Sequence, residues 1–541
     1  LQADFMADQA QVSGSQEVSW RNRSRRPVLW VGLHGVSADA PDSVAVRTGN
    51  SGTNRAAMVL IDSVAQRDGQ GRLLPLPADA RIRDRLRAGP LRWYRLKKAV
   101  LPGEQLVLHI RYRTQFAGSV GRHTSFVALE WHPKLLAVSA SDSVEKPNST
   151  PVFSIPAFAD YRVSLTAPVN MRIAASGTLL RCDSTGTSHT DEFAGDNVQK
   201  FGWLALYDYA EMQEHIGETQ VKLFLKQGNG KHRARYLDTI RKALDYLQAT
   251  YGDYPYPTLS VIDIEKEHAD LIGNTLVLAP VADWLTMGYT HFFERTLFYR
   301  LAAQYWSQAI APVQAEKSWL LHGLAAYSGM RMLELHYGKP ANLIDHLGIR
   351  LSDFEYHRLH YLKNLIAAKK SHNAILGAGQ HEHDFQSKAA LFWATIAHQL
   401  TPQSFDSNLQ AFYQSWKFKQ PDLQKLIALC AKTTDRDIEK FVEQFAQSDR
   451  LADYAIDELT TGRHSGAPSP FESQSQVIVV DVRESSAPSG SLAPFHTSIA
   501  VSRLGELAFP AEIEVVFADG LRQRLQWDGE NDAQRFGLIS N

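Results

Sequence analysis

Two groups of histidines and carboxylates have the residue types and the spacing that metal-assisted chemistry would need. The run HEHD (His381–Asp384) supplies four potential ligands in a row, and HFFE (His291–Glu294) places a His and a Glu three residues apart. Two side chains at that spacing share one face of a helix. Imidazoles and carboxylates bind zinc, and a bound zinc ion can activate water for hydrolysis. A metal site is therefore one hypothesis for each group.

Both groups also have a simpler interpretation. Adjacent residues rarely converge on one ion, so HEHD is typical of a polar loop before a helix, and HFFE of a helix start with an exposed Glu. The two cysteines, Cys182 and Cys430, form no CxxC pattern, which excludes a disulfide framework and a cysteine zinc site. The sequence also contains no G-x-S-x-G turn, no phosphate-binding loop and no cysteine-nucleophile pattern.

The composition is that of a folded protein with several domains. The chain has 541 residues, of which 44% are hydrophobic and 21% charged. Its net charge of −1 gives no reason to expect nucleic acid or an anionic membrane as a partner. No apolar run approaches the ~18 residues of a membrane-spanning helix. Because the chain begins at Leu1 and not at a Met, a signal peptide or a membrane anchor outside this sequence stays open.

The hydrophobic pattern changes its period along the chain, which predicts separate domains. Residues 1–217 contain short alternating segments such as EQLVLHIRYRTQF, so we expect an N-terminal β domain, a sandwich or a saddle-shaped sheet. From residue 218 helical spacing takes over. HRARYLDTIRKALDYLQATYG (His232–Gly252) predicts a helix with its C-cap at the terminal Gly. Residues 218–459 are therefore expected to form a mixed α/β-helical domain.

The last part of the chain returns to a β pattern. TTGRHSGAPSPFESQSQ (460–476) is rich in Gly, Ser, Pro and Thr, which predicts a linker. Beyond it, QVIVVDV, HTSIAVSRLG and AEIEVVFADG are short strands separated by turn residues. They predict a β-sandwich domain over residues 477–541. The expected fold class is thus multidomain α+β.

The order of these segments resembles the zinc aminopeptidases of the gluzincin class, the family of aminopeptidase N and leukotriene A hydrolase. YGDYPYPTLSVIDI (Tyr251–Ile264) is similar to the segment at which the family's catalytic domain begins. LPGEQLVLHIRY (Leu101–Tyr112) is similar to part of its N-terminal domain, and IEVVFADG (Ile513–Gly520) to the C-terminal domain of bacterial members. The resemblance spans nearly the whole chain. It implies an N-terminal β-saddle, a thermolysin-like α/β-helical domain and a C-terminal β-sandwich.

The family's catalytic motif is degenerate in this sequence. In the family, the two His of an H-E-x-x-H helix and a Glu eighteen residues later bind zinc, and the Glu inside the motif is the general base. Laid on TLFYRLAAQYWSQAIAPVQAEKSWLLHGLAAY (Thr296–Tyr327), the two His fall on Tyr299 and Ala303. The base falls on Arg300 and the third ligand on His322. The surrounding frame matches at Gln304, Tyr305, Trp306, Trp319, Leu320, Gly323, Ala325 and Tyr327.

The other functional positions of the family also differ here. Its amine-binding motif falls on EHADLIG (Glu267–Gly273), which puts Asp270 where a Glu would hold the ammonium of the substrate. The tyrosine that stabilises the transition state falls on Gln386. The resemblance therefore implies no metal, no cofactor and no catalytic residue. It leaves a set of candidates for lining a peptide cleft, namely Asp270, Gly273, Arg300, His322 and Tyr327.

Arg300 has two interpretations. It replaces a base by a cation that cannot accept a proton at neutral pH and that would repel Zn²⁺. One hypothesis places its guanidinium in the space of the missing metal, paired with Asp270 or with an anion. The other is that residues of an unused site change to whatever packs best.

The leading functional hypothesis is a non-catalytic aminopeptidase-like protein, a pseudopeptidase that binds a protein or peptide partner or serves as a scaffold in a larger assembly. One alternative is a metallo-aminopeptidase with a displaced zinc site; its ligands would come from His291, His322, His381 and His383. The other is a purely structural extracytoplasmic domain. A vestigial cleft would be filled by bulky side chains such as Tyr299, Tyr305 and Phe385. By resemblance to bacterial members, we expect the periplasm or the outer face of the inner membrane.

Overall fold

The protein divides into two compact units in a computed structural model. Unit 1 comprises Leu1–Asn364 and Ala378–Thr433, and unit 2 comprises Leu365–Gly377 and Thr434–Asn541. The structure describes residues 1–34, 36–37, 58–78, 91–116, 125–129, 131–139, 152–154, 157–264, 272–273, 275–280, 290–312, 318–371, 382–434, 438–447, 453–463, 477–481, 495–508, 510–518 and 520–540.

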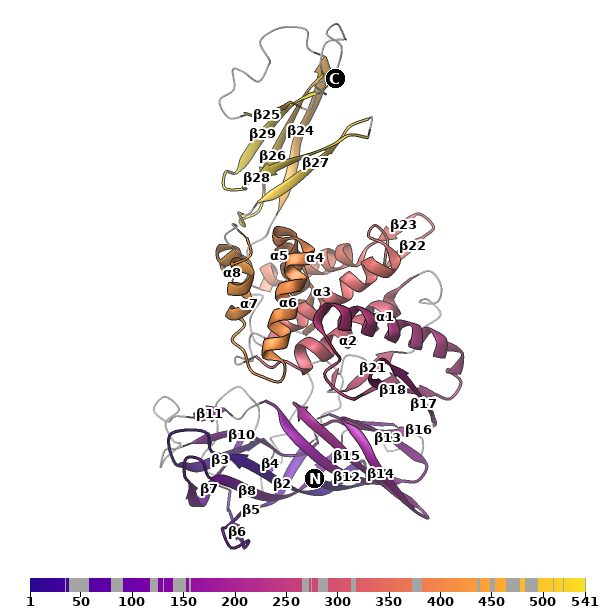
Figure 1. Ribbon diagram of the computed structural model, residues 1–541, viewed down its shortest axis with the longest axis vertical. Helices are drawn as coiled ribbons and strands as arrows, with labels where there is room; N and C mark the ends of the chain where they lie inside the picture. The colour runs from indigo at the N-terminus through magenta and orange to yellow at the C-terminus, as the bar shows by residue number, and fades with distance from the viewer. Residues whose placement is uncertain are drawn as a thin grey trace. The chain divides into compact units, whose positions relative to one another are not determined.

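The N-terminal part of unit 1 consists of β-sheets, as the alternating pattern predicts (Figure 1). In the described residues, the largest sheet has the strand order β14-β15-β12-β1-β2-β8-β5-β4, with β6 paired to β5. Two smaller sheets have the orders β11-β10-β3-β7 and β13-β16-β9. The strands are β1 (Gln2–Met6), β2 (Gln11–Arg21), β3 (Val28–His34), β4 (Val36–Ser37), β5 (Met58–Arg67), β6 (Leu73–Pro75), β7 (Leu91–Val100), β8 (Gln105–Gln115), β9 (Phe126–Ala128), β10 (Lys134–Ser139), β11 (Val152–Ser154), β12 (Ala159–Pro168), β13 (Met171–Ala175), β14 (Thr178–Thr185), β15 (Ser188–Val198) and β16 (Trp203–Tyr207).

Alternation along the strands decides which side chains enter the core of this part. In β8, Leu106, Leu108 and Ile110 are buried, while the residues between them are only partly buried. Successive side chains of a strand point to opposite faces, so a period of two buries one face. Trp131 and Trp203 are both fully buried and pack edge to face, with ring centroids 5.9 Å apart.

A further sheet, with both parallel and antiparallel pairs, lies between the β part and the helices along the chain. Its strand order is β17-β18-β19-β21-β20, and β19 pairs in parallel with both β18 and β21. Every residue of β19 is buried, which is typical of a parallel strand covered on both faces. The strands are β17 (Tyr209–Ile216), β18 (Thr219–Lys226), β19 (Thr258–Ile264), β20 (Ile272–Gly273) and β21 (Leu276–Pro280). The expected domain boundary at 217/218 therefore falls between β17 and β18, two strands paired along their whole length.

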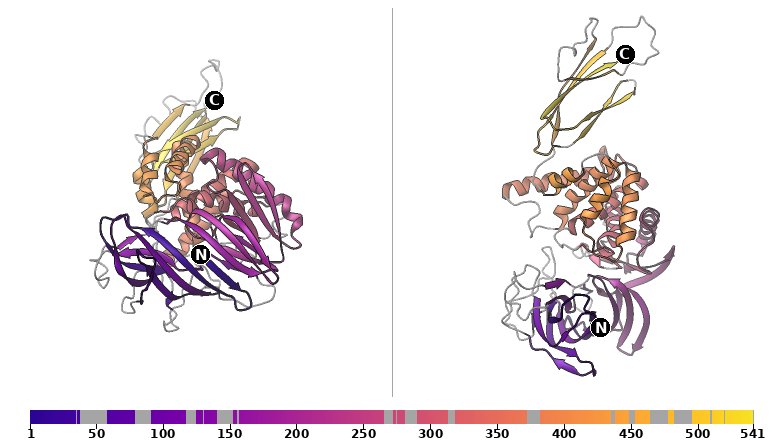
Figure 2. Two further views of the ribbon diagram at one scale, coloured as in Figure 1. Left: turned by 60° about the horizontal axis from the view of Figure 1, so that its bottom comes forward. Right: turned by 60° about the vertical axis from the view of Figure 1, so that its left-hand side comes forward.

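The helices of unit 1 pack beside one another (Figure 2). The first helix runs over Arg233–Tyr251 and ends at Gly252, which has φ +112° and donates its N–H to Gln248 O. This confirms the C-cap predicted from the sequence. The helices are α1 (Arg233–Tyr251), α2 (Phe292–Ala303), which continues as a π-helical turn (Gln304–Gln308), α3 (Ser318–Tyr337), α4 (Asp353–Ser371), α5 (Glu382–Leu400), α6 (Pro402–Trp416) and α7 (Gln424–Ala431). The last residues of α4, from Leu365 on, belong to unit 2. A short hairpin, β22 (Ile344–His346) and β23 (Ile349–Leu351), precedes α4.

Two glycines of α3 let its neighbours approach closely. A Cβ on Gly323 would lie 2.9 Å from the carbonyl carbon and 3.0 Å from the carbonyl oxygen of Ala389 in α5. A Cβ on Gly329 would lie 3.3 Å from the backbone N of Tyr299 in α2. The backbone of α3 is therefore held directly against α2 and α5, the helices that carry the other positions of the degenerate motif.

Unit 2 contains a helix, α8 (Ile438–Gln447), and two small sheets. The sheets have the orders β24-β26-β29-β25 and β27-β28 and share one core that includes Ile499, Leu525, Trp527 and Phe536. Their strands are β24 (Tyr454–Arg463), β25 (Val477–Asp481), β26 (Phe495–Arg503), β27 (Ala511–Val516), β28 (Arg522–Trp527) and β29 (Ala533–Ser540).

The start of the C-terminal sheet differs from the sequence expectation. Strand β24 begins at Tyr454, inside the range expected for the α/β-helical domain, and its last residues overlap the expected linker. Thr460–Arg463 pair in antiparallel register with Ser498–Phe495. Interstrand hydrogen bonding thus places residues in a sheet that their Gly- and Thr-rich composition assigned to a linker.

Within the part of the chain that the structure describes, no helix is both long enough and apolar enough to cross a bilayer.

Candidate functional site

Helices α2 and α3 bring two of the aligned motif positions into contact. Tyr299 lies on α2 and His322 on α3, and the Tyr299 hydroxyl is 3.1 Å from His322 Nδ1. Both side chains are partly buried. The gapless alignment of the motif predicted that these two positions would meet. In this structure they meet as a hydrogen-bonded phenol and imidazole.

The other two aligned positions, Arg300 and Ala303, are on α2, and both side chains are buried. Arg300 is 4% exposed and Ala303 is fully buried. A buried guanidinium is held only where other groups compensate its charge, so Arg300 is part of the packed interior and does not extend into solvent. The expected pairing of Arg300 with Asp270 is not tested, because Asp270 lies outside the described residues.

The frame residues that follow the motif anchor the end of α2 to the turn before β21, to the C-cap of α1 and to α3. The Gln304 side chain is fully buried, and its Oε1 accepts a hydrogen bond from Thr275 N at 2.9 Å. The Tyr305 hydroxyl donates to Gly252 O at 3.2 Å, and Trp306 Nε1 donates to Ser328 Oγ at 3.1 Å. Tyr305 is fully buried in this interior, so it packs in the core and does not plug an open cleft.

The remaining cleft candidates, Gly273 and Tyr327, and the aligned tyrosine position, Gln386, fall in different surroundings. Gly273 ends the short strand β20. Gln386 lies on α5 and is 9% exposed. Tyr327 is 2% exposed and packs edge to face on Phe405 of α6, and this burial raises the pKa of its hydroxyl. A side chain so enclosed has no surface to offer a peptide, so its placement does not support Tyr327 as a cleft residue. The side chain of Phe385 lies outside the described residues.

The residues at the motif positions do not fit a zinc ion. A hydrolytic zinc site needs three protein ligands from His, Asp, Glu or Cys and keeps a fourth position open. Here the three positions carry a phenol, a methyl group and one imidazole, and the imidazole Nδ1 is engaged by the phenol. No group of three or more His, Cys, Asp and Glu side chains suited to a metal occurs in the described ranges.

The HFFE and HEHD runs were the alternative sources of ligands. His291 Nδ1 lies 2.9 Å from Asn342 O, and its ring stacks on Tyr337 with centroids 3.8 Å apart. Glu294 is 4% exposed and forms a two-point ion pair with Arg235. His291 and Glu294 therefore each have a structural role. The expectation that Glu294 is exposed is wrong. His381 and the side chains of His383 and Asp384 lie outside the described residues.

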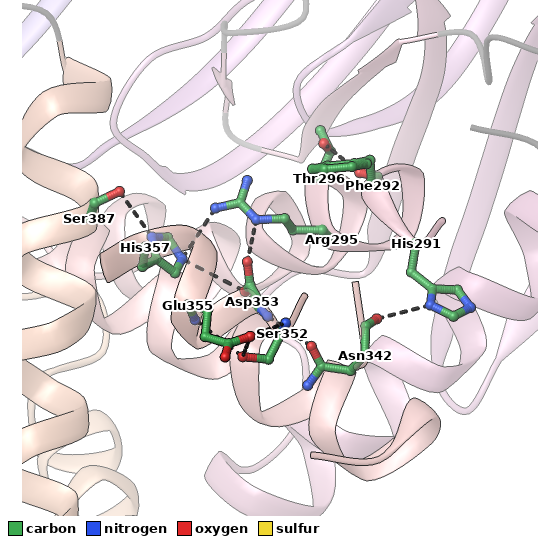
Figure 3. Close-up of polar contacts among 10 residues, drawn as sticks. All are labelled: His291, Phe292, Arg295, Thr296, Asn342, Ser352, Asp353, Glu355, His357 and Ser387. Atoms are coloured by element: carbon green, nitrogen blue, oxygen red, sulfur yellow. Dashed lines mark hydrogen bonds and ion pairs between the residues drawn. The ribbon is translucent and has the colours of Figure 1, made fainter. Parts of the chain in front are cut away.

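A buried polar network joins α2, α4 and α5 next to the motif (Figure 3). Arg295 Nε donates to Asp353 Oδ1, and Arg295 Nη2 lies 3.2 Å from His357 Nε2. His357 Nδ1 lies 3.0 Å from Ser387 Oγ. Asp353, His357 and Ser387 are each less than 5% exposed. The network therefore links one turn of α2 to the residue that follows Gln386.

A capping box positions the α4 residues of this network. Ser352 Oγ accepts from Glu355 N at 3.2 Å, and Glu355 Oε2 accepts from Ser352 N at 2.8 Å. Such a reciprocal pair fixes the start of a helix. Asp353 and His357, four residues apart, then lie on one face of α4. The S-x-x-E pattern and this spacing were the signals in the sequence that could have indicated the network, which the motif alignment missed.

Serine, histidine and aspartate meet here, yet the hydrogen bonds exclude a nucleophilic triad. Arg295 can only donate, so His357 Nε2 must be the acceptor and carries no proton. The proton is then on Nδ1, which donates to Ser387 Oγ. In a hydrolytic triad the imidazole instead removes the serine proton. The assigned tautomer and the 4% exposure of Ser387 both make this a structural arrangement.

This network predicts a pH dependence of stability. The pKa of His357 is lowered to about 4, mainly by burial; the Asp353 carboxylate opposes this shift, and the charges of Arg295 and His360 add to it. In the unfolded chain the pKa is ~6.5. Between these values the unfolded state binds a proton that the folded state does not. The free energy of unfolding therefore falls as the pH falls from above 6.5 towards 4, by ~3 kcal/mol from this residue.

Urea unfolding of unit 1, followed by helical circular dichroism between pH 7 and pH 4, measures this effect. His357→Gln should flatten the dependence, because Gln does not titrate. His398→Gln, at an exposed position of α5, is the matched control and should leave the slope unchanged. An equal slope for His357→Gln and the wild type would contradict the prediction.

Comparison with known proteins supports the fold. No protein-family model and no curated protein sequence matches the chain. Two solved structures of the M1 zinc metallopeptidase from Deinococcus radiodurans, one of them a mutant, match with a TM-score of 0.55. Their identities to this chain are 14% and 13%, and each match covers 83% of this chain and 92% of the other. This chain therefore has the mixed α+β, multidomain fold of M1 zinc metallopeptidases.

Proposed function

We propose that the protein is a pseudopeptidase, a protein with an M1 peptidase fold that binds a protein or peptide partner without hydrolysing it. The observation that carries the proposal is the pairing of Tyr299 with His322. At the position that the alignment gives to the first ligand stands a tyrosine, which is not one of the usual zinc ligands, and it is hydrogen-bonded to His322, the one imidazole of the three aligned positions. The general-base position carries a buried arginine, which cannot take a proton from water at neutral pH.

Retention of the frame favours a binding or scaffolding role. Gln304 and Trp306 keep buried hydrogen bonds, and Gly323 keeps the close packing of α3 on α5. These features maintain a fold whose family members bind peptides, which by itself is an argument from fold. We also propose that the protein works outside the cytoplasm, at the outer face of a bacterial inner membrane, on the basis of the family resemblance alone.

Metal content tests the catalytic half of the proposal. The purified chain is incubated with excess zinc, free ion is removed, and bound zinc and aminopeptidase activity are measured. We expect no stoichiometric zinc and no zinc-dependent hydrolysis. About one zinc per chain, the content of a working site, would overturn the proposal in favour of a displaced metal site. Single alanine variants of His322, His381 and His383 would then locate it.

Peptide binding tests the other half. A fluorescent peptide with a free N-terminus is titrated against the protein, and amide hydrogen exchange is followed in α2 and α3 with and without it. We expect saturable binding and slower exchange in these helices. The absence of both would favour the purely structural alternative.

A further inference from the structure

A pocket lies away from the motif, between strands of three different sheets. Its volume is about 360 Å³, within the range of sites for small ligands. Residues of β13, β14, β15, β17, β18 and β19 line it; Figure 1 labels most of these strands in the lower part of the view. Its apolar surface includes Ile173, Leu179, Phe193 and Phe224.

A buried carboxylate faces this pocket. Asp191 lies on β15, is 5% exposed and lines the pocket. Its Oδ2 is 3.5 Å from His189 Nε2. Its Oδ1 is shielded from solvent and accepts no hydrogen bond from any described residue. A buried carboxylate oxygen without a donor is unfavourable, so this atom is the natural acceptor for a donor group of a ligand.

Strand register explains why these groups converge. Strand β14 pairs with β15 so that Cys182 lies opposite Asp191, and Ser184 opposite His189. Alternation then points all four side chains to the same face of the hairpin. The Asp191 carboxylate is the main cause that raises the pKa of the Cys182 thiol, to about 11. The thiol therefore stays neutral near pH 7 and lines the pocket as a polar group, not as a nucleophile.

The lining of the pocket also includes a cation. Lys222 lines the pocket from β18, opposite Ser260 of β19. The neighbouring Arg172 donates to Tyr209 O and lies 3.8 Å from the Glu211 carboxylate. Lys222 forms no ion pair with a described residue. Arg172 and Glu211 also line the pocket, as an ion pair. The pocket thus presents an acceptor oxygen, an ammonium group and an apolar surface beside this pair.

We propose that this pocket binds a small zwitterion with an apolar body. The ligand's primary ammonium donates to Asp191 Oδ1, its carboxylate lies towards Lys222, and its apolar body packs on Phe193 and Phe224. The proposal is independent of the pseudopeptidase function, because it uses no residue of α2 or α3.

The ligand-side test uses three related probes with the wild-type chain. L-Phenylalanine has both charged groups, N-acetyl-L-phenylalanine lacks the ammonium, and L-phenylalaninamide lacks the carboxylate. Isothermal titration should show saturable binding of L-phenylalanine, binding weakened about tenfold or more by acetylation, and a smaller loss for the amide. Binding of the N-acetyl compound as tight as that of the free amine, or no saturable binding of L-phenylalanine, would overturn the proposal.

The protein-side test compares three variants whose folding is checked by circular dichroism. Asp191→Asn should weaken L-phenylalanine binding about tenfold or more. Lys222→Met should weaken L-phenylalanine binding and leave the amide unaffected. Asp183→Asn is the matched control, since Asp183 lies on the other face of β14 and pairs with Arg181 at 2.7 Å. Unchanged affinity of a folded Asp191→Asn would contradict the proposal; if that variant does not fold, the probe comparison with the wild type decides.

Discussion

Replacing Asp353 by alanine should lower the free energy of unfolding of unit 1 by about 3–5 kcal/mol. The side chain of Asp353 is 2% exposed and that of its partner Arg295 is 17% exposed. Removing the carboxylate leaves a largely buried guanidinium without its anion, and such an uncompensated charge is the main cost. His357 Nε2 would also lose its nearby carboxylate. Urea unfolding, monitored by helical circular dichroism, measures the change.

Two further variants separate this cause from a general loss of side-chain contacts. Asp62→Ala removes an ion pair with Arg113 in which both side chains are about a third or more exposed, and solvent screening should hold its effect to about 0.2–1 kcal/mol. The double variant Arg295→Met, Asp353→Leu removes both charges and should be more stable than Asp353→Ala alone. If Asp353→Ala unfolds within ~1 kcal/mol of the wild type, the network does not hold α2 and α4 together in the way argued here.

Placing the zinc-binding motif of M1 metallopeptidases at the aligned positions should create a zinc site between α2 and α3. The variant combines Tyr299→His, Arg300→Glu, Ala303→His and His322→Glu. The contact between Tyr299 and His322 indicates that side chains from α2 and α3 reach one point. Positions 299 and 303 are one helical turn apart, as two zinc-binding His require. We expect about one zinc per chain after removal of free metal, against none in the wild type.

The matched control keeps Ala303 and carries the other three substitutions. It offers two ligands in place of three, so it should lose most of the bound zinc. Because Ala303 is fully buried, circular dichroism must show that the four-residue variant is folded. A folded variant with no more zinc than the wild type would mean that the three positions do not converge, and the gapless alignment of the motif would be wrong.

Local patterns were enough to predict the order of strand-rich and helix-rich segments along the chain, but not where each segment ends. Alternation predicted the N-terminal sheets, and Gly252 marked the end of α1. Strand β24 could not be predicted, because its place in the sheet comes from pairing with residues some forty positions later. Such pairing depends on which other strand the fold brings beside β24, and the composition of residues 454–463 carries no information about that.

For the site, the sequence by itself determined which chemical groups are present: a phenol, a guanidinium and a methyl group at positions where zinc chemistry needs imidazoles and a carboxylate. Helical spacing fixed that Tyr299 and Ala303 are one turn apart. Only the tertiary structure decided that Tyr299 engages His322, that Tyr327 is enclosed by α6, and that Arg295, Asp353, His357 and Ser387 form one network. These contacts join residues 23 to 78 positions apart through helix packing, and the energy of a buried charge or hydrogen bond depends on what lies within a few ångströms of it.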